Sequence, residues 1–121
     1  IGQAVQIAKG SDTLILGNGD LANLPDAIEK IRSTQVDGAL IGRASLGNPW
    51  VFQNKTVPFA QKMQVALEQS RLFSQLFNGK GFGRIRKHLL AYCKGEEGAK
   101  SLRLRLMKVN TVQEVESLLL H

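Results

Sequence analysis

Apolar and polar positions recur with two different periods along the chain, and the period changes near the middle. Two short apolar runs, 14–16 and 36–41, predict strands, and the first is typical of a strand that is covered on both faces. The segment 23–33 between them has an N-cap residue, an early proline and the apolar spacing of a helix. Residues 1–8 also have helical spacing. The order strand, helix, strand predicts a βαβ unit with two parallel neighbouring strands.

Beyond a polar linker at 53–58 the apolar positions recur only at the helical period. One long helix is expected from 58 to 77, and further helices are expected at 83–94, 96–109 and 111–119. Short connections join these helices, which predicts a small four-helix bundle after the α/β part.

The same spacing predicts helix starts and buried side chains. Thr111 and Glu114 have the spacing of a capping box at the start of the last helix. The helix of the βαβ unit is expected to bury Ala27, Ile28 and Ile31. The helices of the second half are expected to bury Val65, Leu67, Leu72, Leu76, Phe77, Ile85, Leu89, Tyr92 and Cys93.

Each strand of the βαβ unit ends in a turn that is suited to an anion. Gly17-Asn18-Gly19-Asp20 follows the first strand, and Gly42-Arg43 follows the second. Glycine allows close approach of a ligand to the backbone, and successive free N–H groups form an anion-binding nest. Because the ends of parallel strands meet at one edge of a sheet, the two turns predict half of a phosphate site. The alternative is two plain turns with Arg43 on the surface.

Charge is distributed unevenly along the 121 residues. Residues 1–60 contain five basic and five acidic residues, whereas residues 61–121 contain eleven and five, so the whole net charge of +6 lies in the second half. This asymmetry indicates a neutral ligand-binding part joined to a polyanion-binding part, or else a solvated basic surface. No apolar run is long enough to span a membrane, and no cluster of ligands predicts a metal. The single cysteine suits a reducing cytosol.

Several motifs resemble those of the tRNA-dihydrouridine synthase family. GNGD at 17–20, DGALIGRA at 37–44 and LGNPW at 46–50 resemble the flavin-binding end of these enzymes. RKHLLAY at 86–92 and the basic segment 99–103 resemble their C-terminal helical domain. The resemblance follows the family's order over nearly the whole chain.

The resemblance implies a cytoplasmic flavoenzyme that reduces the 5,6 double bond of uridine in tRNA with NADPH. It implies an α/β part followed by an all-α part: 1–54 as the last βα units of an FMN-binding TIM barrel, and 55–121 as a helical tRNA-binding domain. The residues implied to bind the FMN phosphate are Asn18, Gly19, Asp20, Gly42 and Arg43.

The basic helices would then hold tRNA phosphates, with an affinity that falls as salt rises. Arg86 and His88 lie near the edge of the apolar stripe, and they are expected either to contact RNA or to bond the bundle to the barrel. The residues implied to line the RNA-binding groove are Arg84, Lys87, Lys94, Lys100, Arg103, Arg105 and Lys108.

The family's catalytic cysteine belongs to the first half of its barrel, so no catalytic residue is assigned here. The chain is expected to be the inactive C-terminal third of an enzyme, with Cys93 as an inert core thiol. Its orphan strand edges could pair two copies. One alternative is a stand-alone basic helical RNA-binding module with a remnant βαβ unit. Another is a different FMN-dependent barrel, such as a relative of dihydroorotate dehydrogenase, although the basic helices argue against it.

Overall fold

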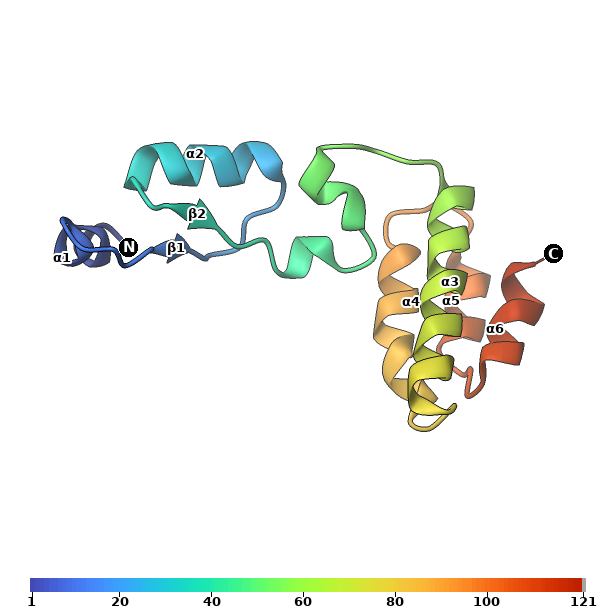
Figure 1. Cartoon of the computed structure of the whole chain (residues 1–121). Coiled ribbons are helices and arrows are strands. Elements are labelled where there is room, and N and C mark those ends of the chain that lie inside the picture. The colour runs from blue at the N-terminus through green and yellow to red at the C-terminus, as the bar shows by residue number, and fades with distance from the viewer. Residues whose placement is uncertain (121) are drawn as a thin grey trace. The chain divides into compact units, whose positions relative to one another are not determined.

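The chain forms two compact units in the computed structural model, which describes residues 1–120 (Figure 1). The first unit comprises Ile1–Ser45 and Pro49–Thr56. The second comprises Leu46–Asn48 and the residues from Val57 onward. Together they contain several helices and a small parallel sheet of two strands. The assignment of 1–54 to a barrel and of 55–121 to a four-helix tRNA-binding bundle stays a prediction.

The sheet of the first unit pairs β1 (Leu16–Gly17) with β2 (Gly38–Ala39) in parallel, as predicted. The Asp37 N–H donates to the Ile15 carbonyl over 2.8 Å, which extends the pairing by one hydrogen bond before the strands. Helix α2 (Leu24–Thr34) connects the two strands and runs beside β2 in Figure 1. Strand, helix and strand therefore form the expected βαβ unit, with strands shorter than the apolar runs.

The start of α2 follows the sequence prediction. Asn23 is its N-cap, and its side-chain oxygen accepts a hydrogen bond of 2.9 Å from the Asp26 N–H. Pro25 lies in the first turn, where its missing N–H costs nothing. Helix α1 (Gly2–Ala8) precedes the sheet.

The apolar faces of the first unit are more exposed than expected. Leu14 and Leu16 are 72% and 54% exposed, so the prediction that the first strand is covered on both faces is wrong for this chain. Ile28 is 46% exposed, whereas Ala27 is buried at 4%. The physical reason is that α2 covers one face of a two-stranded sheet, and no further layer exists among residues 1–120.

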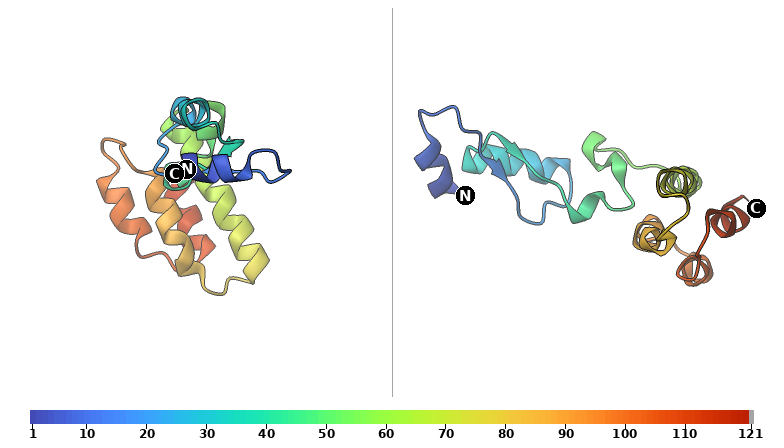
Figure 2. Two further views of the ribbon diagram at one scale, coloured as in Figure 1. Left: turned by 90° about the vertical axis from the view of Figure 1, so that its left-hand side faces the viewer. Right: turned by 60° about the horizontal axis from the view of Figure 1, so that its bottom comes forward.

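The second unit contains four α-helices, which Figure 2 shows nearly end-on in its right-hand view. They are α3 (Phe59–Phe77), α4 (Arg86–Tyr92), α5 (Lys100–Leu106) and α6 (Val112–Leu119). Helix α3 packs against α4 and α6, and α5 packs against α4 and α6. The largest fully buried side chains of this unit are Ile85, Leu89, Cys93, Leu106, Val115 and Ser70.

Two helices of this unit begin differently from the prediction. The segment expected as one helix over 83–94 begins with the 3-10 helix η3 (Phe82–Ile85) and continues as α4. Helix α5 begins at Lys100 rather than at Glu96, because Gly98 has φ +79°, which is outside the helical region. The predicted apolar stripe is nevertheless buried as expected, and it consists of Ile85, Leu89, Tyr92 and Cys93.

Helix α3 buries a different face from the one predicted. Leu72, Leu76 and Phe77 are 55%, 68% and 44% exposed, so their predicted burial is wrong. Apolar residues lie on several sides of this helix, and its periodicity alone does not select the side that meets α4 and α6. The side chains that it buries are Met63, Ala66, Leu67 and Ser70.

The start of α6 contains most of the predicted capping box. The Thr111 hydroxyl accepts a hydrogen bond of 3.2 Å from the Glu114 N–H. The Glu114 carboxylate accepts its return bond from the N–H of Asn110, one residue earlier than the pattern predicts. Among residues 1–120, no helix has the length and hydrophobicity that a membrane span requires.

Candidate functional site

The two glycine turns lie beside each other at the carboxyl end of the sheet. Because β1 and β2 are parallel, the chain leaves both strands in the same direction, through 18–20 after β1 and through 40–43 after β2. The Arg43 guanidinium forms an ion pair with the Asp20 carboxylate across the two turns. The structure therefore brings together the two segments that the sequence predicted to share a site.

The backbone of both turns is open. A Cβ atom built at Gly19 or at Gly42 would meet no atom within 4 Å. Gly19 has φ +149°, which favours glycine, whereas Gly42 has no such requirement. Within residues 1–120, the N–H groups of Asn18, Gly19 and Arg43 donate to no protein acceptor. A small anion could therefore approach the backbone at Gly19 and Gly42 without a Cβ atom in its way.

Asp20 differs from the other residues predicted to bind a phosphate, because its side chain is itself negatively charged. Its φ of +50° turns the chain sharply, and its carboxylate bonds the Arg43 guanidinium. Both side chains are largely exposed, so the pair adds little stability to the fold. Its effect is geometric, because it ties the guanidinium to the turn after β1, at the residue next to Gly19, while leaving other N–H groups of Arg43 free.

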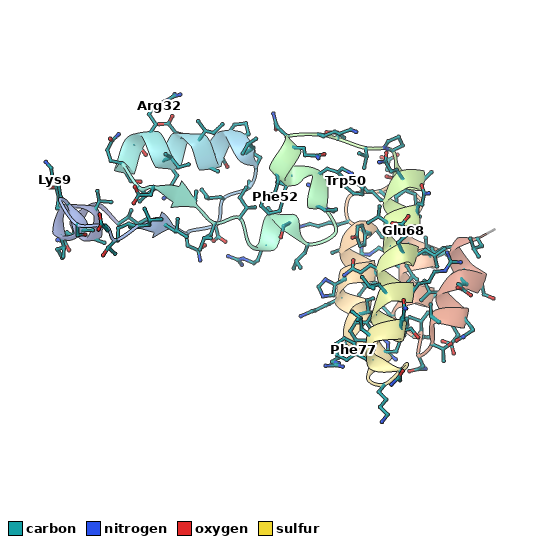
Figure 3. All side chains as sticks on the ribbon, viewed as in Figure 1. Lys9, Arg32, Trp50, Phe52, Glu68 and Phe77 are labelled. Atoms are coloured by element: carbon teal, nitrogen blue, oxygen red, sulfur yellow. The ribbon has the colours of Figure 1, made fainter. Side chains whose placement is uncertain are left out.

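The segment after Arg43 forms two short 3-10 helices. In η1 (Arg43–Ser45) the Ser45 hydroxyl donates to the Gly42 carbonyl over 2.7 Å, which stabilises the turn. Pro49 begins η2 (Pro49–Gln53), because proline fits the first position of a helix. Trp50 of η2, labelled in Figure 3, is buried.

All seven residues that the resemblance implied for RNA binding have exposed side chains. Within residues 1–120, the ion pairs join other residues, so none of these seven cations has an acidic partner. Unpaired cations attract phosphates more strongly than paired ones, because no carboxylate must be displaced first. Their contact with RNA stays a prediction.

Arg84 has a structural contact that the sequence did not predict. Its guanidinium lies over the rings of Phe73 and Phe77, at 5.4 and 4.9 Å from their centroids, and its Nε donates to the Gly81 carbonyl. Phe77, labelled in Figure 3, ends α3. These cation–π contacts hold the side chain on its own unit. Sequence spacing missed them because a turn separates the partners.

Arg86 bonds two elements of the helical unit together. Its Nε donates to the Val109 carbonyl over 2.8 Å, and its Nη2 donates to the Asn110 side-chain oxygen over 2.5 Å. It therefore joins α4 to the turn between α5 and α6, which makes these contacts structural. His88 is half-buried, and burial together with the nearby Lys87 charge lowers its pKa below the usual 6.5.

Gly47 is a further residue whose importance the sequence did not reveal. It has φ +65°, and a Cβ atom there would fall 2.3 Å from the carbonyl carbon of Ala91 and 2.4 Å from the Tyr92 nitrogen. The segment that contains it accordingly belongs to the helical unit. No local pattern signals this contact, because it depends on a backbone more than forty positions away.

Cys93 is buried in the core of the helical unit, as predicted. Burial raises the pKa of its thiol, and the nearby Arg103 offsets this only in part. A thiol of this kind stays protonated at neutral pH and reacts slowly. Among residues 1–120, no group of three or more histidine, cysteine, aspartate or glutamate side chains could hold a metal ion.

Comparison with known proteins identifies the family. A family model described as dihydrouridine synthase (Dus) matches residues 3–121. The probable tRNA-dihydrouridine synthase of Helicobacter pylori is 35% identical over 86% of this chain and 32% of its own length. The probable tRNA-dihydrouridine synthase 1 of Synechocystis is 32% identical over 87% of this chain and 33% of its own length. The chain thus spans about a third of the length of these curated relatives, and it belongs to the dihydrouridine synthase family.

Proposed function

We propose that this chain supplies the FMN phosphate-binding turns and the tRNA-binding helices of a flavin-dependent tRNA-dihydrouridine synthase. Such an enzyme reduces the 5,6 double bond of uridine in tRNA, with NADPH as the reductant. Two relatives bear the name probable tRNA-dihydrouridine synthase, which supports the reaction class. No residue of this chain is assigned a catalytic role, and its contribution is binding.

The observation that carries the cofactor proposal is the pair of open turns at one edge of the sheet. A terminal phosphate fits the unused amides of Asn18, Gly19 and Arg43, and the absence of a side chain at Gly42 leaves it room. The Arg43 guanidinium would add a charge-assisted hydrogen bond, with Asp20 holding it in position. When bound, FMN supplies the hydride chemistry, and these residues hold it by its phosphate.

The tRNA proposal rests on the exposed, unpaired cations of the helical unit. The second half of the chain carries the entire net charge, and the seven cations proposed to bind tRNA lie on η3, α4 and α5 and in the segments that follow α4 and α5. Such a surface attracts phosphates without reading sequence. Selectivity for a particular uridine would come from the shape of the tRNA and from a base that is extruded from it.

Replacement of Arg43 tests the cofactor proposal in the enzyme that contains this chain. Arg43→Ala should lower the flavin content after gel filtration by about tenfold, because a charge-assisted hydrogen bond contributes about 1.5–3 kcal/mol. The affinity for tRNA should stay unchanged. Flavin absorbance per protein and a filter-binding titration measure the two quantities.

Arg32→Ala is the matched control. Arg32 is an exposed arginine in the last turn of α2, it pairs with Glu29, and it points away from the sheet in Figure 3. Its removal should change neither quantity. An Arg43→Ala enzyme that retains flavin like the control would refute the phosphate role.

The alternative function, a stand-alone RNA-binding module, draws support from the helical unit's own buried core. The same titrations separate the two functions. Binding of tRNA without any retention of FMN in every tested preparation would favour the module, whereas retention that depends on Arg43 favours the enzyme.

A further inference from the structure

A pocket of about 470 Å³ lies between α5 and α6 in the helical unit. Its volume falls in the range of about 300–1,000 Å³ that small-molecule sites occupy. No residue of the phosphate turns, which belong to the other unit, lines this pocket. The proposed function counts Arg105 and Lys108 among the cations that attract tRNA phosphates, but it assigns no ligand to the pocket that they line.

Two cations stand on the α5 side of the pocket. Arg105 lies in the last turn of α5 and Lys108 lies two residues beyond the end of this helix, and both line the pocket. Both are exposed, and within residues 1–120 neither forms an ion pair. The pocket therefore presents two unpaired positive charges.

The remaining walls combine an apolar surface with neutral polar groups. Leu118 and the aliphatic parts of Arg105 and Lys108 supply apolar surface, whereas Val109 is only 2% exposed. Gln113 and Ser117 lie four residues apart on α6, so their side chains share one face of the helix and offer both donors and acceptors.

Glu114 is the acidic residue of the pocket, and its position is set by the helix start. One of its carboxylate oxygens accepts the Asn110 N–H over 2.8 Å, and the charge lies in the first turn of α6, where the helix dipole stabilises it. One carboxylate offsets only one of the two cations, so the pocket keeps a positive net charge.

From this arrangement we propose that the pocket binds a single nucleotide. The base lies against Leu118, its edge meets the polar pair on α6, and its phosphate lies between Arg105 and Lys108. An inorganic anion would leave the apolar wall unused, and a purely apolar ligand would leave both charges unused. The nucleotide is an unstacked residue of the RNA or a free mononucleotide. The RNA source rests on the proposed tRNA binding.

Titration of the 121-residue chain with uridine monophosphate, uridine, inorganic phosphate, oligouridylate and tRNA tests this proposal. Amide chemical shifts in nuclear magnetic resonance spectra report the site, and filter binding reports the RNA affinity. Uridine monophosphate should shift amides of α5 and α6 and bind at least about tenfold more tightly than uridine or phosphate, since base and phosphate contribute together.

Two variants alter the pocket and two matched controls leave it intact. Arg105→Gln with Lys108→Gln removes its cations, and Lys62→Gln with Lys80→Gln removes the same charge from the helical unit at positions that neither line the pocket nor belong to the proposed RNA-binding set. Ser117→Phe fills the pocket without changing charge, and Ser101→Phe adds the same side chain on exposed α5 surface. Both pocket variants should lower the affinity for uridine monophosphate about tenfold. The controls should leave it unchanged.

The outcomes separate this proposal from the proposed function. Equal effects of the two charge variants, with no effect of Ser117→Phe, would overturn the pocket and leave the tRNA surface intact. Loss of mononucleotide binding in both pocket variants supports the site. If the pocket variants also lower the affinity for oligouridylate and tRNA, the bound nucleotide is part of the RNA. If neither RNA binds the chain at all, the ligand is a free mononucleotide, and the proposed tRNA binding is wrong.

Discussion

At the scale of single residues, two glycines in neighbouring segments have opposite reasons for lacking a side chain. At Gly47 a Cβ atom would overlap the backbone of Ala91 and Tyr92, and φ is +65°. At Gly42 a Cβ atom would meet no atom within 4 Å, and the φ of this residue is not positive. The first glycine is therefore required by packing, and the second leaves space that a ligand could use.

Replacement of both glycines by alanine tests this distinction. Gly47→Ala should lower the free energy of unfolding by about 2 kcal/mol or more, because it combines a strained φ with overpacking against a backbone that cannot move aside. Gly42→Ala should change it by less than about 1 kcal/mol. Urea denaturation of the 121-residue chain measures both values. Similar losses in the two variants would contradict the packing argument.

At the scale of elements, the capping residues were predictable and the packed faces were only partly so. Asn23 and Thr111 cap α2 and α6 as their local patterns predicted, because a cap depends on residues two or three positions away. The buried face of α3 depends instead on where α4 and α6 lie. Its exposed Leu72 and Leu76 fit the helical period as well as the buried positions do, which is why periodicity selected the wrong side.

Removal of the α6 cap should have a local and measurable cost. Thr111→Ala should lower the free energy of unfolding by about 1 kcal/mol, because the Glu114 N–H loses its acceptor. Thr56→Ala is the control, since Thr56 is exposed and precedes α3 without capping it. Urea denaturation compares the two variants. An equal, small change in both would mean that the hydrogen bond contributes nothing to stability.

At the scale of the whole molecule, charge and chemistry are divided between the two units. The first half is neutral and contains the open turns, whereas the second half carries the whole net charge of +6. The residues that the resemblance implies for the FMN phosphate lie in the first half, and those that it implies for RNA lie in the second. The structure adds that Arg84 and Arg86 also have structural contacts, so not every basic side chain of the second half is free for RNA.

The division predicts how salt affects tRNA binding by variants of the 121-residue chain. Lys87→Gln with Lys94→Gln should reduce the slope of log affinity against log salt by about two, because each phosphate contact contributes about one. Lys9→Gln with Lys55→Gln removes the same charge from exposed positions of the first unit and should leave the slope unchanged. Filter binding over a range of salt concentrations measures both slopes. Equal slopes in the two variants would assign the attraction to net charge rather than to the helical surface.

The sequence alone determined the features that depend on close neighbours: the order of helices and strands, two of the caps, the βαβ unit, and the two turns whose parallel strands bring them to one edge. Its motifs also determined the family. Only the tertiary structure decided which face of α3 is buried, that Gly47 packs on α4, that Asp20 holds Arg43, and that an open pocket lies between α5 and α6. These features join groups that are distant in the chain, and local spacing carries no information about which distant groups meet.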